Sequence, residues 1–285
     1  MTPPVVYGLN GMPRLELTHD SGSMAQIYLN GAHVTSWTPV GWHDMLYLSR
    51  LARFAPGVPI RGGIPVVFPQ FADQGPLPRH GWLRTTTWQV APSGEAEDST
   101  HATLFTEDND ASRRIWPHRY RVELDVTIAE RSLAIALSIF NPGPESFSFT
   151  SALHNYFFVA DVRESHIEGL HDAQYLDKTD GLRQKTEAEE KTGIGRETDR
   201  IYRNTPSTVV LHDHASGTAL QIGSTAFPDI VVWNPWEAGA KQISDMADED
   251  YLRMICIEPA LAVTPCVLAP GQRWAAAQEL TVLDS

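Results

Sequence analysis

Cysteine, lysine and long apolar runs are scarce in this sequence. Its two cysteines, Cys256 and Cys266, are too few for a disulfide framework or a four-cysteine zinc site. We expect both thiols to be reduced and buried. No apolar stretch is long enough to cross a bilayer, and the Met1-Thr-Pro-Pro start lacks the basic and apolar regions of a secretory signal. These absences predict a cytoplasmic protein with no membrane partner.

Positive charge is also in short supply, because 22 Lys and Arg face 35 Asp and Glu and leave a net charge of -13. Such an acidic chain is poorly suited to bind nucleic acid or an anionic membrane. The 42% share of hydrophobic residues is large enough for a sizeable core and excludes a disordered chain. We expect residues 1–285 to form a single domain and the protein to be a monomer.

Helical patterns are rare, whereas strand patterns are common. No convincing helix is longer than two turns, and residues 108–116 read as one capped helical turn that stops before Pro117. Apolar and polar residues alternate between residues 120 and 139, and Asn30-Gly31 is a strong hairpin signal. Further strands are expected at residues 147–151, 208–211, 219–222, 230–233, 254–257 and 275–282. The chain therefore reads as all-β, a large antiparallel β-sandwich with few short helices.

Two stretches interrupt the strand pattern. Residues 44–84 contain many glycines and prolines and show little periodicity, which is typical of a linker or of a ligand-binding surface carried on a scaffold. Residues 177–204 are polar and charged, with no apolar period. We expect this second stretch to leave the sheet as a partly exposed excursion.

The first of these stretches also holds a concentration of positive charge. Residues 50–84 contain five arginines and one acid, Asp73, so this window has a net charge of +4 inside a chain of -13. Guanidinium groups bind phosphate and carboxylate well, and Gly62-Gly63 would let the backbone approach a ligand closely. The window predicts recognition of an anion such as phosphate. A set of surface salt bridges is the alternative interpretation.

Two acid–base candidates lie in apolar, strand-like surroundings. His154 stands at the end of a strand series, where packing could fix the geometry of a group that titrates near neutral pH. Glu258 ends the apolar run of residues 254–257, where burial would raise its pKa unless arginines or hydrogen bonds stabilise the anion. The alternatives are a core histidine with satisfied hydrogen bonds and a solvent-facing glutamate at a strand end.

Three further features are weaker signals. Asp199 lies where the polar excursion returns to the sheet. His212 and His214 have the same-face spacing of a strand metal site, but Ala-Ser-Gly follows them and the segment reads as a turn. Trp233 and Trp236 could stack on sugar faces or belong to the core.

Six motifs, taken together and in this order, resemble the hexose-6-phosphate mutarotases. These enzymes are the glucose-6-phosphate 1-epimerase branch of the aldose 1-epimerase, or galactose-mutarotase-like, superfamily. The resemblance implies a β-sandwich of the galactose-mutarotase type, a hexose 6-phosphate as substrate and no cofactor or metal. The motifs are Arg61-Gly-Gly-Ile-Pro-Val-Val-Phe-Pro, Arg79-His80-Gly-Trp-Leu-Arg84, Ala152-Leu-His154-Asn-Tyr-Phe, Thr198-Asp199-Arg-Ile-Tyr202, Asp229-Ile-Val-Val-Trp-Asn-Pro235 and Cys256-Ile-Glu258-Pro.

The resemblance assigns a role to each candidate side chain. His154 matches the general acid of that family and Glu258 matches its general base. Arg61 and Arg84 match arginines that bind the sugar phosphate, and Asp199 matches an aspartate that binds substrate.

His80 matches a histidine that lines the pocket in the wider superfamily. Arg79 departs from the pattern, because a polar uncharged residue such as Gln is expected before the His-Gly pair. A third arginine there would tighten the phosphate site or change the preferred sugar. Ala260 is a smaller departure, since Gly is expected after Glu-Pro.

Anomer exchange needs one base and one acid, and it needs no metal or redox cofactor. One base removes the proton of the anomeric hydroxyl while an acid protonates the ring oxygen, C1 turns about its bond to C2, and the ring closes on the other face. Ionised Glu258 and protonated His154, on opposite sides of the sugar, would suit this reaction. The alternatives are an aldose 1-epimerase acting on free sugars, a glycosidase using Glu258 and Asp199, and a carbohydrate-binding or sensor protein without activity.

Overall fold

The alternating residues 120–139 form two paired strands in the computed structural model, which describes residues 3–92 and 100–284. Strand β8 (Arg121–Ile128) buries Val122, Leu124 and Val126, and its polar residues between them face outward. The same alternation continues in β9 (Ser132–Phe140). Since one face of each strand is buried, the register of the pair is determined by its apolar set. The predicted antiparallel strands are confirmed here.

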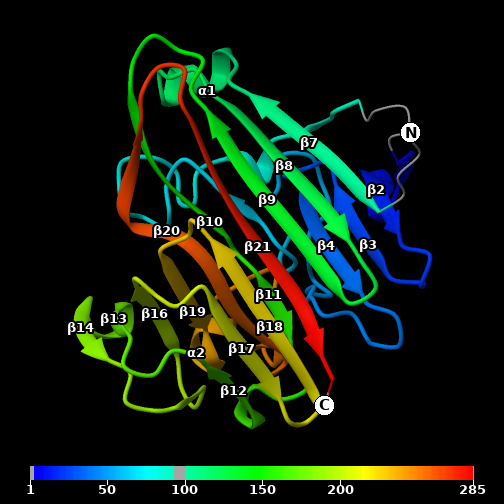
Figure 1. Ribbon diagram of the computed structural model, residues 1–285, viewed down its shortest axis with the longest axis vertical. Helices are drawn as coiled ribbons and strands as arrows, with labels where there is room; N and C mark the ends of the chain where they lie inside the picture. The colour runs from blue at the N-terminus through cyan, green and yellow to red at the C-terminus, as the bar shows by residue number, and fades with distance from the viewer. Residues whose placement is uncertain (1–2, 93–99, 285) are drawn as a thin grey trace.

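In the described part of the chain, the largest sheet has nine strands, in the order β15-β12-β17-β18-β21-β9-β8-β7-β6. In Figure 1, β7, β8, β9 and β21 cross the upper part of the molecule side by side, and β18, β17 and β12 continue the sheet below. The remaining strands of this sheet are β6 (Gln89–Val90), β7 (His101–Glu107), β12 (Ser165–Glu168), β15 (Lys191–Gly193), β17 (Thr208–Asp213), β18 (Thr218–Thr225) and β21 (Arg273–Leu283).

A second sheet of eight strands has the order β14-β13-β16-β19-β20-β10-β5, with β11 also paired to β20. The long strand β20 is therefore at its centre and pairs with β19, β10 and β11. Its strands are β5 (Val66–Val67), β10 (Phe147–Leu153), β11 (Tyr156–Phe158), β13 (Gln174–Asp177), β14 (Arg183–Thr186), β16 (Thr198–Arg203), β19 (Asp229–Asn234) and β20 (Met254–Leu268).

The third sheet has four strands and includes the predicted Asn-Gly hairpin. It joins β1 (Val5–Tyr7), β2 (Pro13–Thr18), β3 (Met24–Tyr28) and β4 (His33–Thr38) in that order. The described residues contain two short α-helices, α1 (Asp110–Ile115) and α2 (Trp236–Ala240). The predicted capped turn at residues 108–116 is α1, and Asn109 is its cap. The 3₁₀ turns are η1 (Leu9–Gly11), η2 (Leu83–Thr85), η3 (Val162–Glu164), η4 (Lys178–Asp180) and η5 (Asp250–Arg253). None of these helices could span a bilayer.

Two expectations about individual segments were wrong. Residues 177–204 do not leave the sheet, because they supply β14 and β16 to the eight-stranded sheet and β15 to the nine-stranded one. Backbone hydrogen bonds hold the polar strands β14 and β15 at sheet edges without a continuous apolar face, whereas β16 lies inside its sheet and buries Ile201 and Tyr202. Cys256 is buried and free as expected, whereas the free thiol of Cys266 is only partly buried.

The two large sheets share one core and are joined by a buried polar contact. Ile257 of β20 and Leu280 of β21 belong to the same cluster of buried apolar residues. Beside them, the Asn155 amide donates to Gln278 Oε1 at 2.8 Å, and the Gln278 amide donates back to Asn155 Oδ1 at 2.9 Å. Asn155 also donates to the carbonyl of Ile257 at 2.9 Å. The contact fixes the chain next to His154, the sequence neighbour of Asn155.

Replacing Gln278 by leucine should leave the buried Asn155 amide without its side-chain partner and lower the free energy of unfolding by about 1–3 kcal/mol. Urea unfolding measures this change. Gln184→Leu is the matched control, because Gln184 makes a similar contact to Gln174 at 3.1 Å on the exposed side of β14. The control should change stability by less than about 0.5 kcal/mol. Equal losses in the two variants would contradict a structural role for the buried amide pair.

Candidate active site

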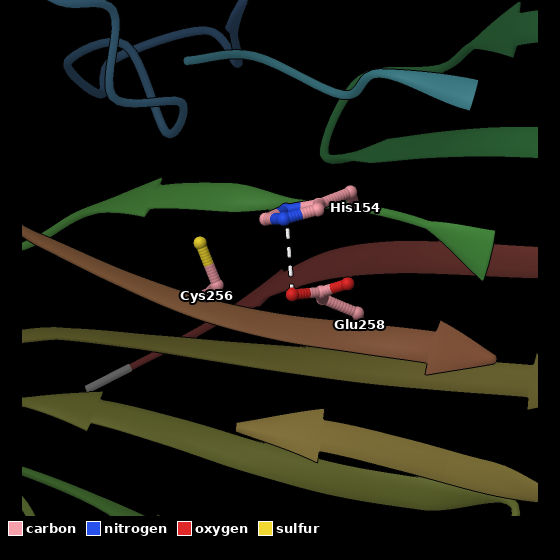
Figure 2. A group of neighbouring side chains, drawn as sticks. All are labelled: His154, Cys256 and Glu258. Carbon is pink, nitrogen blue, oxygen red and sulfur yellow. Dashed lines mark ion pairs between the residues drawn. The ribbon is translucent and has the colours of Figure 1, made fainter. Parts of the chain in front are cut away.

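The register of the eight-stranded sheet places His154 opposite Glu258. Both β10 and β11 pair with β20, so that Ala152 lies opposite Ala260 and Tyr156 lies opposite Cys256. His154 occupies the gap between β10 and β11, and the same register puts it across from Glu258. His154 Nδ1 is 3.3 Å from Glu258 Oε1, and Figure 2 shows the two side chains pointing toward each other.

This geometry corrects two sequence-based expectations. Glu258 does not end its strand, because β20 continues to Leu268. His154 and Glu258 also do not stand on opposite sides of a sugar-sized space, since cross-strand neighbours are too close to hold a ring between them. Their polar atoms can instead approach a ligand together, from one side and at two neighbouring oxygens.

Three further side chains, from β19 and β16, lie on the same face of the sheet as His154 and Glu258. Val231 of β19 lies opposite Glu258, and Trp233 lies opposite Cys256 and, on its other side, opposite Asp199 of β16. Side chains at alternate positions of a strand share a face, so Val231, Trp233 and Asp199 line one floor with the acid–base pair.

The imidazole of His154 is held in place by packing and by the backbone. Its ring stacks on Tyr156 with centroids 4.8 Å apart and planes 7° apart, and Trp233 meets it edge-on at 6.2 Å. The His154 backbone N–H donates to the carbonyl of Pro65 at 3.0 Å. A ring fixed in this way has the rigid geometry that proton transfer at a defined atom requires.

The arginine-rich loop forms the walls of the pocket, as the charge window predicts. Arg61, Arg79, His80 and Arg84 all line the cavity above the His154–Glu258 pair. The sequence-predicted site residues are thus brought together in one pocket. The structure supplies this proximity, and their roles in catalysis and binding stay predictions.

The arginines differ in how their charge is balanced. Arg61 Nε lies 3.0 Å from Asp245 Oδ1, and its Nη1 donates to the Tyr156 hydroxyl at 2.9 Å. Arg84 donates to the backbone carbonyl of Arg79 at 3.1 Å, and no carboxylate among the described residues lies within 4.0 Å of it. Arg84 therefore brings to the pocket a positive charge that no described carboxylate contacts directly.

Arg79, which departs from the family pattern, is the most exposed of the three. Its side chain is 62% exposed and its guanidinium lies 3.7 Å from Asp73, which is itself largely exposed. An ion pair with both partners in solvent contributes little to stability, so Arg79 can leave it at little cost. The position at the rim suits a residue that contacts the outer part of a ligand.

Lys178 is a pocket residue that the sequence analysis missed. Its Nζ is 2.7 Å from Asp199 Oδ2, so the predicted substrate-binding aspartate is part of an ion pair. The turn η4 positions Lys178, because Asp177 accepts a hydrogen bond from the Thr179 backbone at 3.0 Å. No motif marks this lysine, and its only signal was its rarity as one of few lysines in the chain.

His80 is buried and neutral. Its backbone has a φ of 63°, a left-handed conformation, and its Nδ1 accepts from the Ala72 N–H at 3.4 Å. Burial, with the nearby charges of Arg84 and Arg79, lowers the pKa of His80 to about 2. Since Nδ1 is an acceptor, the ring proton is on Nε2, which makes His80 a hydrogen-bond donor. Its ring centroid is 5.4 Å from that of His154.

The charge states of the acid–base pair are set mainly by burial. Burial lowers the pKa of His154 well below its usual value, and the positive charges of Arg84 and Arg61 act in the same direction. Burial raises the pKa of Glu258 well above its usual value, and the Asp199 charge adds to this effect. The ligand-free pocket therefore favours a neutral imidazole beside a protonated carboxyl, instead of the expected ion pair.

Cys256 is the third potential metal ligand in this group. With His154 and Glu258 it offers ligand-type atoms within 4.8 Å of one another (Figure 2). Burial raises the pKa of the Cys256 thiol well above its usual value, and a metal binds the thiolate. The residue therefore fits a packing role against the acid–base pair better than a role as a ligand.

The comparisons with known proteins agree with this architecture. A profile described as aldose 1-epimerase matches residues 13–281. A protein of Cenchrus ciliaris, named "Putative glucose-6-phosphate 1-epimerase", is 34% identical over 284 residues, which cover 97% of this chain and 86% of that protein. An Escherichia coli K12 protein of the same name is 32% identical over 241 residues, covering 84% of this chain and 80% of that protein.

A solved structure extends the likeness to three dimensions. The crystal structure of "a putative mutarotase (YeaD)" from Salmonella typhimurium matches with a TM-score of 0.87 and 28% sequence identity, over 99% of this chain and 97% of that one. The predicted β-sandwich of the galactose-mutarotase type is confirmed. Because the family profile spans nearly the whole sequence, the chain belongs to the aldose 1-epimerase family.

Proposed function

We propose that the protein is a glucose-6-phosphate 1-epimerase, which interconverts the α and β anomers of a hexose 6-phosphate. The observation that carries this proposal is the acid–base pair His154 and Glu258 on the floor of a pocket whose walls hold Arg61, Arg79 and Arg84. The names of the relatives from Cenchrus ciliaris and Escherichia coli support the same substrate.

The positive wall of the pocket is assigned to the phosphate group. No described carboxylate contacts Arg84 directly, and Arg61 is held in place by Asp245 and Tyr156. A phosphate dianion would accept charge-assisted hydrogen bonds from both, with Arg79 reaching in from the rim. Asp199, together with Lys178, would bind sugar hydroxyls.

The close approach of His154 and Glu258 suits the two oxygens of the anomeric carbon. Glu258, as carboxylate, takes the proton from the O1 hydroxyl, and the C1–O1 bond becomes a carbonyl. The bond between C1 and the ring oxygen breaks, and the ring oxygen takes its proton from the His154 imidazolium. Rotation about C1–C2 and the reverse proton transfers then close the ring as the other anomer.

Burial of His154 and Glu258 favours the charge state that they have when the sugar ring is open. The opened sugar coexists with neutral His154 and protonated Glu258, which is the charge state that the buried site prefers. The phosphate counteracts the positive charges of Arg84 and Arg61 that lower the pKa of His154. Substrate binding thus helps to form the imidazolium that starts the reaction.

The competing functions fit the pocket less well. A glycosidase built on Glu258 and Asp199 would leave the contact of His154 with Glu258 without a role. An epimerase of free sugars would not need the arginine wall. A protein that only binds sugars would gain nothing from burying His154 and Glu258, whose pKa values are shifted in opposite directions.

Glu258→Gln and His154→Asn should each remove most of the anomer exchange, because the two proton transfers belong to one event and each contributes about 10²–10⁴-fold. The double variant should be only slightly slower than either single variant. Magnetisation-transfer NMR between α- and β-glucose 6-phosphate measures the exchange, and ligand titration checks that binding survives. Near-wild-type exchange in folded Glu258→Gln would refute the assignment.

Arg84→Gln should raise KM for glucose 6-phosphate roughly 10- to 150-fold, since a charge-assisted hydrogen bond contributes about 1.5–3 kcal/mol. Activity on unphosphorylated glucose should not fall, because that sugar has no phosphate for Arg84 to bind. Arg50→Gln is the matched control, because Arg50 is 72% exposed and pairs only loosely with Glu249, at 3.8 Å. Equal losses on both sugars would show that Arg84 reads the sugar ring or supports the fold.

Arg84→Gln should also raise the apparent pKa of His154. A neighbouring positive charge disfavours the imidazolium, so removing the charge favours it, and the His154 pKa moves up toward the usual 6.5. NMR titration of the His154 ring signal, identified by its loss in His154→Asn, measures the shift. An unchanged or lower pKa would contradict the placement of Arg84 as an electrostatic partner of His154.

A further inference from the structure

A second group of titratable side chains lies on the nine-stranded sheet. His166 of β12 is directly opposite His212 of β17 in the register of the two strands. Glu168 follows two residues later on β12, and His214 follows two residues after His212. Ile167, between His166 and Glu168, and Leu211, next to His212, belong to the buried core. The three histidines and the glutamate therefore share the outer face of this sheet, in the part formed by β12 and β17 (Figure 1).

The polar atoms of this group converge on Glu168. His166 Nε2 is 3.2 Å from Glu168 Oε1, and His212 Nε2 is 3.4 Å from Glu168 Oε2. One ligand atom from each of the three residues lies within 4.8 Å of the other two. Among the described residues, the only other group with this property is the one that contains His154 and Glu258.

The group has an unused donor or acceptor at its centre. His212 Nε2 is shielded from solvent, lies 3.4 Å from Glu168 Oε2 and makes no hydrogen bond with any residue that the structure describes. The His212 ring instead stacks on His166, with centroids 4.7 Å apart and planes 10° apart. A buried nitrogen without a partner costs free energy, and a bound cation would remove that cost.

We propose that His166, Glu168 and His212 bind one divalent transition-metal ion of the zinc class. Bonds of about 2.0–2.2 Å from zinc to imidazole nitrogen and carboxylate oxygen place two ligand atoms roughly 3.3–3.5 Å apart at the tetrahedral angle. The contact of His166 with Oε1, 3.2 Å, and that of His212 with Oε2, 3.4 Å, have nearly this spacing, each to a different oxygen of the Glu168 carboxylate. The stacked rings and the carboxylate need to turn toward the ion, and a water molecule completes the coordination.

His214 acts in this site as a positioning residue. Its Nε2 is 3.2 Å from His166 Nδ1, the ring nitrogen that faces away from Glu168. A metal-binding histidine commonly donates its second ring N–H to an outer partner, which fixes the tautomer that leaves Nε2 free for the ion. Lys191, 3.7 Å from Glu168 and largely exposed, balances the carboxylate when no ion is bound and can move into solvent.

The site joins two neighbouring strands and contains no member of the proposed catalytic pair. An ion held by β12 and β17 would therefore cross-link this part of the sheet and stabilise the folded chain, by an amount that rises with metal concentration. The sequence pattern alone reads residues 212–214 as a turn, because Ala-Ser-Gly follows them, whereas His212 lies in β17. It also gives no link to His166 and Glu168, which are remote in sequence. The sheet register supplies the missing ligands.

Titration calorimetry of the tag-free protein with ZnCl₂ tests the proposal. We expect one ion per chain and a higher melting temperature with zinc. His212→Ala and Glu168→Gln should each weaken binding at least about 100-fold, whereas loss of the outer partner in His214→Ala should cost roughly tenfold. His214→Gln keeps an acceptor and should restore most of that affinity. His154→Asn should bind zinc like the wild type.

Cobalt(II) identifies the ligands by a second readout. Its visible spectrum should show a nitrogen–oxygen site, and the signal should vanish in His212→Ala. A thiolate-to-cobalt charge-transfer band that disappears in Cys256→Ser would put the ion at the other cluster and overturn the proposal. The absence of saturable zinc binding, or unchanged binding in both His212→Ala and Glu168→Gln, would overturn it equally.

Discussion

The antiparallel ladder between β20 and the β10–β11 segment is the constraint on which the pocket depends. One register places Ala152 opposite Ala260 and Tyr156 opposite Cys256, and the residue pair between them is His154 and Glu258. A shift of either strand by one residue would turn its side chain to the other face of the sheet and separate the pair. The Asn155–Gln278 contact helps to prevent such a shift, because it ties the same segment to the opposite sheet through a buried amide pair.

Charge in the pocket is arranged around this pair. The chain is acidic overall, yet it concentrates arginines in the loop above the sheet, and Arg84 has no carboxylate partner among the described residues. The loop charges and the burial of the floor both oppose an imidazolium at His154. A ligand with a phosphate group relieves the first of these effects. In the proposed function, binding of the phosphate therefore also favours protonation of His154, the general acid.

Much of this architecture could be predicted, and the failures have physical reasons. Apolar alternation gives a clear strand signal in β8 and β9, where one face is buried. Strand β14 has no such alternation, because none of its residues is buried. Its position depends on backbone pairing with β13. Glu258 seemed to end a strand because it closes the apolar run of residues 254–257, but β20 continues through Pro259 to Leu268. Lys178 had no motif, since its role rests on a spatial contact with Asp199.

Residue types and their local order determined the fold class, the positive loop in an acidic chain and the identity of the acid–base candidates. These features depend on the period of side chains along a strand and on chemistry that each residue carries by itself. Tertiary structure alone decided distances and charge states. It made His154 and Glu258 direct neighbours, left Arg84 without a carboxylate partner among the described residues, and joined His166 and Glu168 to His212 across a sheet. Such contacts depend on strand register and burial, which bring together groups that are far apart in the chain.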